Sequence, residues 1–364
     1  MKRKLLAMIS VAVTASMLIT GCGSSSSSSS DSSSDASSTE ATEESSDDSK
    51  STDAKDSAEA STEDYDISDI DASSVGKIGM VVNYAGQDPY QTSYYDAMTS
   101  YAKEIGADLQ ILDPKGDATK QANQVQDLIN MKCSVIILWP VNGETAVASA
   151  RAVDKAGIPC MTSNTDVDES GQSFVKCYVG PSNVQEAKQT AEQLVADLGE
   201  DAKVAEISGP AGYTTSLERT EGMEEGLGDK ITLLDSQTGE GNREKCQQVA
   251  ENYLIKYGEG EIDAIFTFDD NAAIGVVNAI EAAGRDDVKV YAAAAGSYST
   301  LEYIADGRIS ATSMQSPYYD AESALAMAVK IADGYEPAQY ANYIETPVAT
   351  QDNAAELQSS LEEW

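Results

Sequence analysis

Residues 77–98 read KIGMVVNYAGQDPYQTSYYDAM and contain a predicted strand, a polar loop and the first part of a predicted helix. The apolar run 77–83 is typical of a buried parallel strand, and residues 91–105 have the spacing of a helix. Similar apolar runs recur at 108–113, 134–139, 158–163, 174–179, 203–208, 231–236, 264–268 and 288–293. This repeated order of strand and helix predicts an α/β fold with parallel sheets covered by helices on both faces.

Helical patterns separate these apolar runs. They cover 91–105, 119–131, 144–156, 184–198, 216–227, 243–257, 272–283, 299–306 and 319–333. The sequence Gly180-Pro181-Ser182 interrupts the alternation and divides it into two similar series. We therefore predict two doubly wound α/β lobes.

The N-terminus has the features of a secretory signal. Three basic residues at 2–4 precede an apolar run at 5–19, which is shorter than the roughly 20 residues of a membrane-spanning helix. The run ends in Leu18-Ile19-Thr20-Gly21-Cys22. This ending resembles the bacterial lipobox and predicts that Cys22 carries lipid on the outer face of the cytoplasmic membrane. An ordinary signal peptide with an incidental cysteine is the alternative.

A low-complexity segment follows at 23–76, rich in Ser, Asp, Glu and Thr. Such a composition buries too little apolar surface to offset the entropy of ordering. We predict a disordered tether that lifts the folded part from the membrane into a cell wall, as on a Gram-positive cell.

The composition excludes several classes of protein. With 61 acidic against 24 basic residues the net charge is −37, which disfavours nucleic acid as a partner. The chain has no histidine, so histidine-based triads and metal sites are excluded. Four cysteines follow Cys22, without any CxxC spacing, and their disulfide status stays open: Cys133, Cys160, Cys177 and Cys246. We predict no catalytic residue, cofactor or metal.

Polar and aromatic residues lie at the predicted strand ends. In doubly wound sheets, ligands bind beyond the carboxyl ends of the strands. Amides and carboxylates there bond hydroxyl groups, and aromatic faces cover the apolar side of a sugar ring. The candidates are Asn83, Asp88, Tyr90, Trp139, Asn164, Tyr213 and Asp269.

Several segments in order carry a family resemblance. Besides 77–98 they include QANQVQDLINMKCSVIILWPV, AGIPCMTSN, GPAGYTTSLERTEGM, IDAIFTFDDNAAIGVVNAIEAAG and DGRISATSMQSP. Residues 77 to about 350 thus resemble the type I periplasmic sugar-binding proteins of the ribose and galactose kind. The resemblance implies two lobes that close about a three-strand hinge, and a closed form that docks on an ABC permease. It implies an N-terminal lobe of 77–181 plus 316–345 and a C-terminal lobe of 182–315 plus 346–364.

The resemblance also implies binding positions, with departures. It adds Gln315 as the hinge glutamine and supports Asn83, Asp88, Tyr90, Asn164 and Asp269 as site positions. Gln91 stands where a second aromatic is usual. Asn164 replaces a carboxylate, Thr165 and Leu217 replace arginines, Asp269 replaces an asparagine, and Ala292–Gly296 replaces Gly-Phe-Asp. We interpret Glu218-Arg219 as an exposed helix pair.

Each candidate has a purely structural alternative. Asp269 or Asp270 can cap the following helix, Asn83 and Asn164 can stabilise turns, and Gln315 can be a hinge bond donor. Trp139, Tyr90 and Tyr213 can serve in packing alone.

The sequence as a whole predicts a monomeric solute-binding lipoprotein of an ABC importer for a sugar or sugar-like molecule. A sensory receptor of the same fold, a nucleoside or amine binder, and an extracytoplasmic glycosidase with Asp88 and Asp269 as paired carboxylates are the alternatives.

Overall fold

The computed structural model describes residues 63, 65–229 and 231–360. The predicted signal peptide with Cys22, and the tether as far as residue 62, lie outside the described residues. Among the described helices, none is long and apolar enough to span a membrane.

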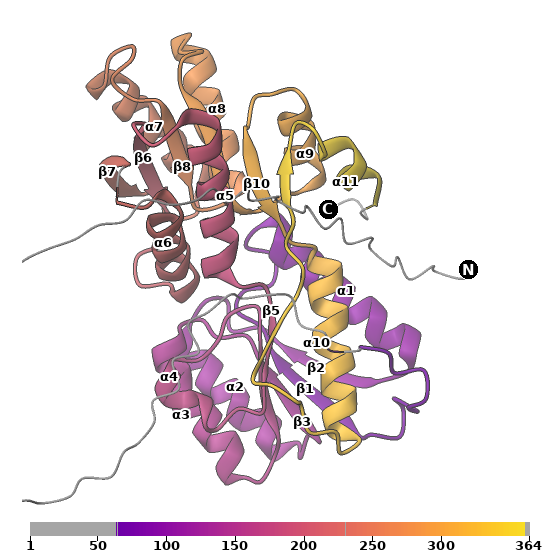
Figure 1. Cartoon of the computed structure of the whole chain (residues 1–364). Coiled ribbons are helices and arrows are strands. Elements are labelled where there is room, and N and C mark those ends of the chain that lie inside the picture. The colour runs from indigo at the N-terminus through magenta and orange to yellow at the C-terminus, as the bar shows by residue number, and fades with distance from the viewer. Residues whose placement is uncertain (1–62, 64, 230, 361–364) are drawn as a thin grey trace, which may run out of the picture. The chain divides into compact units, whose positions relative to one another are not determined.

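The first lobe is built on a six-stranded parallel sheet with the order β11-β5-β4-β3-β1-β2 (Figure 1). Its central strands β1 and β3 are almost completely buried, because helices cover both faces. Its strands are β1 (Lys77–Val81), β2 (Asp108–Leu112), β3 (Val135–Leu138), β4 (Cys160–Ser163), β5 (Tyr178–Gly180) and β11 (Ala341–Tyr343). Its helices are α1 (Pro89–Ile105), α2 (Ala118–Asn130), α3 (Gly143–Lys155), α4 (Glu169–Gln172) and α10 (Pro317–Ala332).

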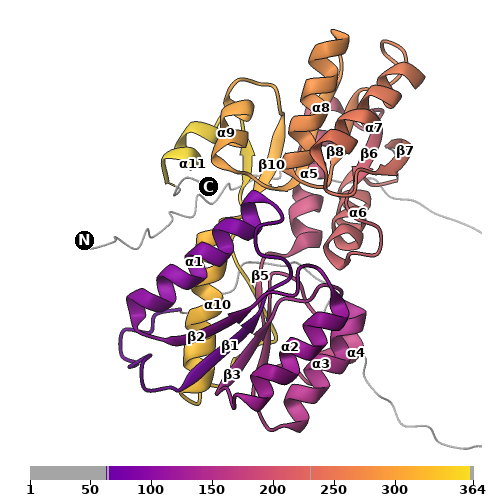
Figure 2. The same ribbon diagram turned by 180° about the vertical axis from the view of Figure 1, so that it is seen from behind.

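The second lobe repeats the plan with the order β12-β10-β9-β8-β6-β7, in which only the edge pair β12–β10 is antiparallel (Figure 2). Its strands are β6 (Lys203–Ser208), β7 (Thr232–Thr238), β8 (Ala264–Thr267), β9 (Lys289–Ala295), β10 (Ala311–Met314) and β12 (Val348–Thr350). Its helices are α5 (Asn183–Leu198), α6 (Thr214–Leu227), α7 (Arg243–Lys256), α8 (Asp270–Ala283), α9 (Tyr298–Ala305) and α11 (Ala354–Ser360). The prediction of two parallel-sheet α/β lobes is confirmed.

The chain passes between the two sheets three times. The passages follow β5, β10 and β11, and they lead into α5, α10 and β12. In Figures 1 and 2, α10 therefore lies beside α1 although more than two hundred residues separate them in the chain, and both helices contribute to the same apolar core.

The start of the folded part differs from the expectation. Ile67, Ala72 and Val75 are buried in the core beneath α1 and α10, although they belong to the predicted tether 23–76. Glu63 also accepts a hydrogen bond from Lys330 at 2.8 Å. A few apolar residues within an acidic segment are thus enough to attach it to the lobe, so the boundary at residue 76 was placed too late.

The four cysteines of the described part are buried free thiols. Burial raises the pKa of Cys160, Cys177 and Cys246 to about 12, which keeps them protonated and unreactive. Cys133 is buried against the sheet as well. The cysteines therefore serve as small apolar side chains of the cores.

Candidate functional site

A cavity of about 280 Å³ lies where the strand ends of both lobes meet, and we call it the interlobe cavity. All but one of the predicted site residues line it: Asp88, Tyr90, Trp139, Asn164, Tyr213, Asp269 and Gln315. The exception is Asn83, whose side chain donates a hydrogen bond to the Tyr213 hydroxyl at 3.2 Å. Asn83 is therefore not a lining residue, but it holds the lining residue Tyr213.

The wall formed by the first lobe is a bonded network. Tyr90 donates to Asp320 Oδ2 at 2.8 Å, and Asn164 Nδ2 donates to the same oxygen at 2.8 Å. Asp320 comes from α10 and is fully buried, and burial raises its pKa to about 7. Asn164 has a left-handed backbone with φ 61°, which asparagine tolerates better than most residues. Asp320 therefore holds two lining side chains in place.

Asp88 begins α1 and contributes a carboxylate to the same wall. Its Oδ1 accepts from the Gln91 backbone N–H at 2.8 Å, and Pro89 occupies the first helical turn, where a missing N–H costs nothing. Burial raises the pKa of Asp88 above its ordinary value.

Trp139 follows β3 and is buried to 2 % exposure, while it lines the cavity. Its ring packs edge-on against Tyr94 at a centroid distance of 4.7 Å. Trp139 therefore packs against Tyr94 in the core and lines the cavity at the same time.

The wall formed by the second lobe carries more charge. Asp269 caps α8 by accepting from the Ala272 N–H at 2.7 Å, and it also lines the cavity. Burial raises the pKa of Asp269 to about 7, and the neighbouring carboxylates Asp270 and Asp88 contribute to the rise. Asp270 accepts from the Ser297 N–H at 2.9 Å, which ties α8 to the start of α9. Asp269 therefore has both of the roles that the sequence offered as alternatives, because it caps a helix and also lines the cavity.

The expectation of an exposed Glu218-Arg219 pair is wrong. Arg219 is 6 % exposed and lines the cavity, and its Nη2 donates to Glu186 Oε2 at 3.3 Å. Its guanidinium also lies over the Phe268 ring, 4.8 Å from the centroid. Glu218 is largely buried too and accepts from Asn183 at 2.9 Å, and burial raises its pKa to about 7.

The packing of α6 against α5 explains the error. Gly222 lies so close to α5 that an added Cβ would meet the backbone of Val184, and Gly226 does the same at Lys188. This close approach turns one face of α6 inward and carries Arg219 onto Glu186. The signal was present in the sequence, since the buried positions Thr215, Arg219 and Gly222 follow helical spacing.

Sequence reasoning missed further lining residues. Arg243 starts α7 and donates from Nε to Asn271 at 2.9 Å. Thr215 and Ser297 line the cavity as well, and so do Gln91 and Asp270, which the sequence had placed at a usual binding position and beside Asp269. A search for charged or polar residues in the first turn of each helix that follows a strand end would have found Arg243 and Thr215.

Direct hydrogen bonds join the two lobes. Asn142 donates to the Gly212 carbonyl at 3.0 Å, the Gly143 N–H donates to Thr214 at 3.1 Å, and the hydroxyls of Thr165 and Thr215 lie 3.0 Å apart. The lobes therefore touch in this structure, and the cavity lies between them.

Several buried polar atoms of the lining have no hydrogen-bond partner within the protein. They include the donors Trp139 Nε1 and Arg219 Nε and the acceptors Gln91 Oε1 and Gln315 Oε1. Buried polar groups are normally bonded, so these atoms are suited to a bound molecule that offers both donors and acceptors. Hydroxyl groups have this property.

Comparison with known proteins gives a family for this architecture. A family described as periplasmic binding protein domain matches residues 78–336. The ribose import binding protein of Bacillus subtilis is 31% identical over 233 residues, which are 63% of this chain and 73% of the relative.

Solved structures share the fold. A solute-binding protein of an ABC transporter from Bacillus halodurans with bound myo-inositol has a TM-score of 0.71 and 26% identity, over 79% of this chain and 99% of that chain. A solute-binding protein of an ABC transporter from Mycobacterium smegmatis with bound glycerol has a TM-score of 0.70 and 27% identity, over 78% of this chain and 96% of that chain.

Proposed function

Because the chain belongs to the periplasmic binding protein domain family, we propose that it captures a sugar or sugar-like solute between its lobes and delivers it to an ABC importer. The observation that carries the proposal is the interlobe cavity, where unpartnered donors and acceptors lie beside the aromatic side chains of Tyr90 and Trp139. The relatives named for ribose import and solved with myo-inositol and glycerol support this class of ligand. The role is capture and release, without bond chemistry.

A thermal-shift screen of the full chain tests the ligand class. Monosaccharides, polyols, amino sugars, nucleosides and amino acids serve as probes. A probe at 100 times its Kd stabilises the native state by about 2.7 kcal/mol, which is readily visible as a rise in Tm. A response confined to nucleosides or amino acids would contradict the proposal.

Delivery to an importer needs a separate measurement in cells. Deletion of the gene is expected to abolish uptake of the radiolabelled probe that gives the largest thermal shift. Unchanged uptake together with a lost transcriptional response to the same probe would point to a sensory receptor.

We further propose that lipid on Cys22 holds the protein at the outer face of the cytoplasmic membrane. The change Cys22→Ser is expected to move the protein from the membrane fraction to the medium, with the Kd for solute unchanged. Retention of the variant in the membrane fraction would contradict the lipid anchor.

A further inference from the structure

The charges that line the interlobe cavity do not balance. Three carboxyl groups line it, from Asp88, Asp269 and Asp270, against the guanidinium groups of Arg219 and Arg243. Glu186 is fully buried outside the lining, its Oε2 lies 3.3 Å from Arg219 Nη2, and burial raises the pKa of Glu186 to about 8. The cavity and its immediate support therefore hold more carboxyl than guanidinium groups.

The three lining carboxyl groups differ in how their oxygens are used. Oδ2 of Asp270 is bonded within the second lobe, to the Ser297 N–H at 2.9 Å and to the Thr300 hydroxyl at 2.8 Å. Asp88 and Asp269 each use Oδ1 to cap a helix, at 2.8 and 2.7 Å. They come from opposite lobes and line the same cavity.

Asp88 and Asp269 are half-buried, and a neutral solute in the cavity would remove water from both carboxyl groups without replacing its charge-stabilising contacts. Their desolvation is costly unless an opposite charge or charge-assisted hydrogen bonds replace water. Gln91 Oε1 and Gln315 Oε1 add acceptors without partners in the same lining, on side chains that are 8 % and 4 % exposed. An ammonium group has three donors and no acceptor, and so suits an acceptor-rich wall.

We propose that the solute carries a protonated amine, which lies between Asp88 and Asp269, so that it is an amino sugar or an aminocyclitol. This inference rests on the proposed function, because it assigns the chemical class of the solute in the same cavity. The hydroxyl groups of the solute bond Trp139 Nε1 and Arg219 Nε, which are donors without partners.

Calorimetric titration of the full chain with matched probes tests the inference. Each set consists of an amine, its neutral parent and its N-acetyl form: glucosamine, galactosamine and mannosamine with glucose, galactose and mannose, and inosamine with inositol. We expect at least one amine to bind 10-fold or more tighter than its neutral parent. Equal or tighter binding of the neutral parents would overturn the inference that the solute carries an amine. The proposed capture of a sugar would still stand. A lack of binding by every amine probe, together with a thermal shift by another neutral sugar or polyol, would overturn the amine, whereas a thermal shift confined to nucleosides or amino acids would overturn the proposed function itself.

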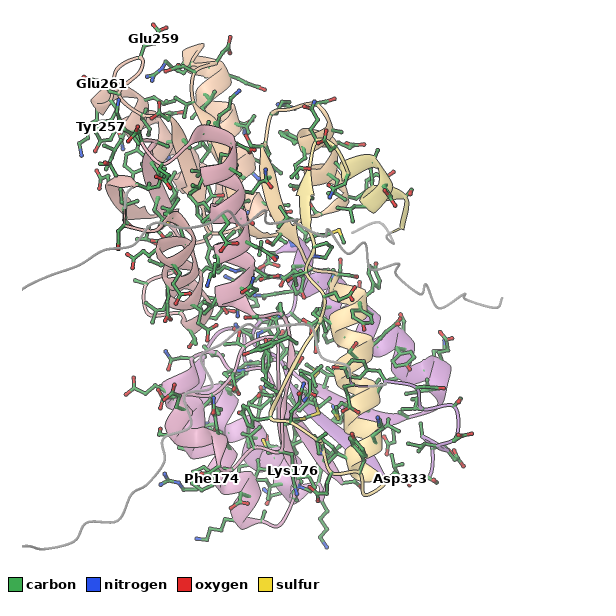
Figure 3. All side chains as sticks on the ribbon, in the orientation of Figure 1. Phe174, Lys176, Tyr257, Glu259, Glu261 and Asp333 are labelled. Atoms are coloured by element: carbon green, nitrogen blue, oxygen red, sulfur yellow. The ribbon has the colours of Figure 1, made fainter. Side chains whose placement is uncertain are left out.

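The change Asp269→Asn separates the charge from the shape of the side chain. We expect the preference for the amine over its parent to fall below about 3-fold, since the amide keeps one acceptor and loses the charge. The matched control is Asp333→Asn, which changes an exposed aspartate at the end of the first lobe that Figure 3 labels. An unchanged preference in Asp269→Asn would overturn the inference.

The pH profile gives a second readout. The charged groups that line the cavity with Asp269 are Asp88 on the N-terminal side of α1, Arg219 on α6, Arg243 on α7 and Asp270 on α8. Because protonation of Asp269 removes one of the two carboxylate partners of the ammonium, the affinity of the wild type for the amine is expected to fall as the pH decreases through about 7. The dependence is expected to weaken in Asp269→Asn, where Asp88 is the remaining carboxyl partner, and an unchanged dependence would overturn the role given to Asp269.

Discussion

The two walls of the interlobe cavity are built on different principles. In the first lobe, Tyr90 and Asn164 are both bonded to Asp320, so these lining groups already have partners within the protein. In the second lobe, Arg219 and Asp269 bring charge to the lining, each held by a neighbouring helix or helix terminus. The first wall is therefore fixed largely by bonds within the protein, whereas most of the charged lining groups come from the second wall, with Asp88 of the first wall as the exception.

The largest effect is expected when the ion pair behind the second wall is removed. The change Arg219→Met leaves Glu186 as a buried carboxylate without its ion-pair partner. Removing one partner of a buried pair costs about 3–5 kcal/mol, and we expect the free energy of unfolding in urea to fall by this amount. A loss below about 1 kcal/mol would show that the pair does not stabilise the second wall. The double variant with Glu186→Gln is the control, and it is expected to recover part of the loss.

The second prediction compares Asp269 of the second wall with Asp320, which is fully buried behind the first wall. Burial raises the pKa of Asp269 and of Asp320 from the ordinary value of 3.8 to about 7. Between these values the folded state binds more protons than the unfolded state, so each group lowers stability as the pH rises from about 4 to about 7. Asparagine has no proton to lose.

The stability of Asp269→Asn and of Asp320→Asn relative to the wild type should therefore increase with pH. We expect a gain of about 1–3 kcal/mol between pH 5 and pH 7, measured by urea denaturation of the unliganded protein. Differences that stay constant across this range would show that neither group titrates there. If the difference in the free energy of unfolding from the wild type stays constant for only one of the two variants, only the other carboxyl group titrates in this pH range.

The smallest effect is expected at an exposed pair in the first lobe. Lys77 and Asp108 lie 2.7 Å apart, with side chains that are 33% and 60% exposed. Exposed pairs contribute about 0–1 kcal/mol, so Lys77→Met should change the free energy of unfolding by no more than this. A loss similar to that of Arg219→Met would show that burial is not what separates the two pairs.

Most of the predicted site residues line the cavity, because strand ends are local features that the sequence reveals. Asp88, Trp139 and Asp269 each follow an apolar run, and parallel strands bring such ends to one edge of a sheet. Arg219 was misjudged because its neighbour Glu186 lies on another helix, and only the close packing at Gly222 brings the two together.

The two α/β lobes and the polar residues at the strand ends could be predicted from the sequence, since periodicity and composition act over short distances. Which charges pair follows from the packing of helices that lie far apart in the chain. Asp320 meets Tyr90 and Asn164 across three separate elements, and Arg219 meets Glu186 across two. Such partners depend on how the helices pack. Because burying an unpaired charge is costly, these contacts determine which charged side chains can lie at the cavity.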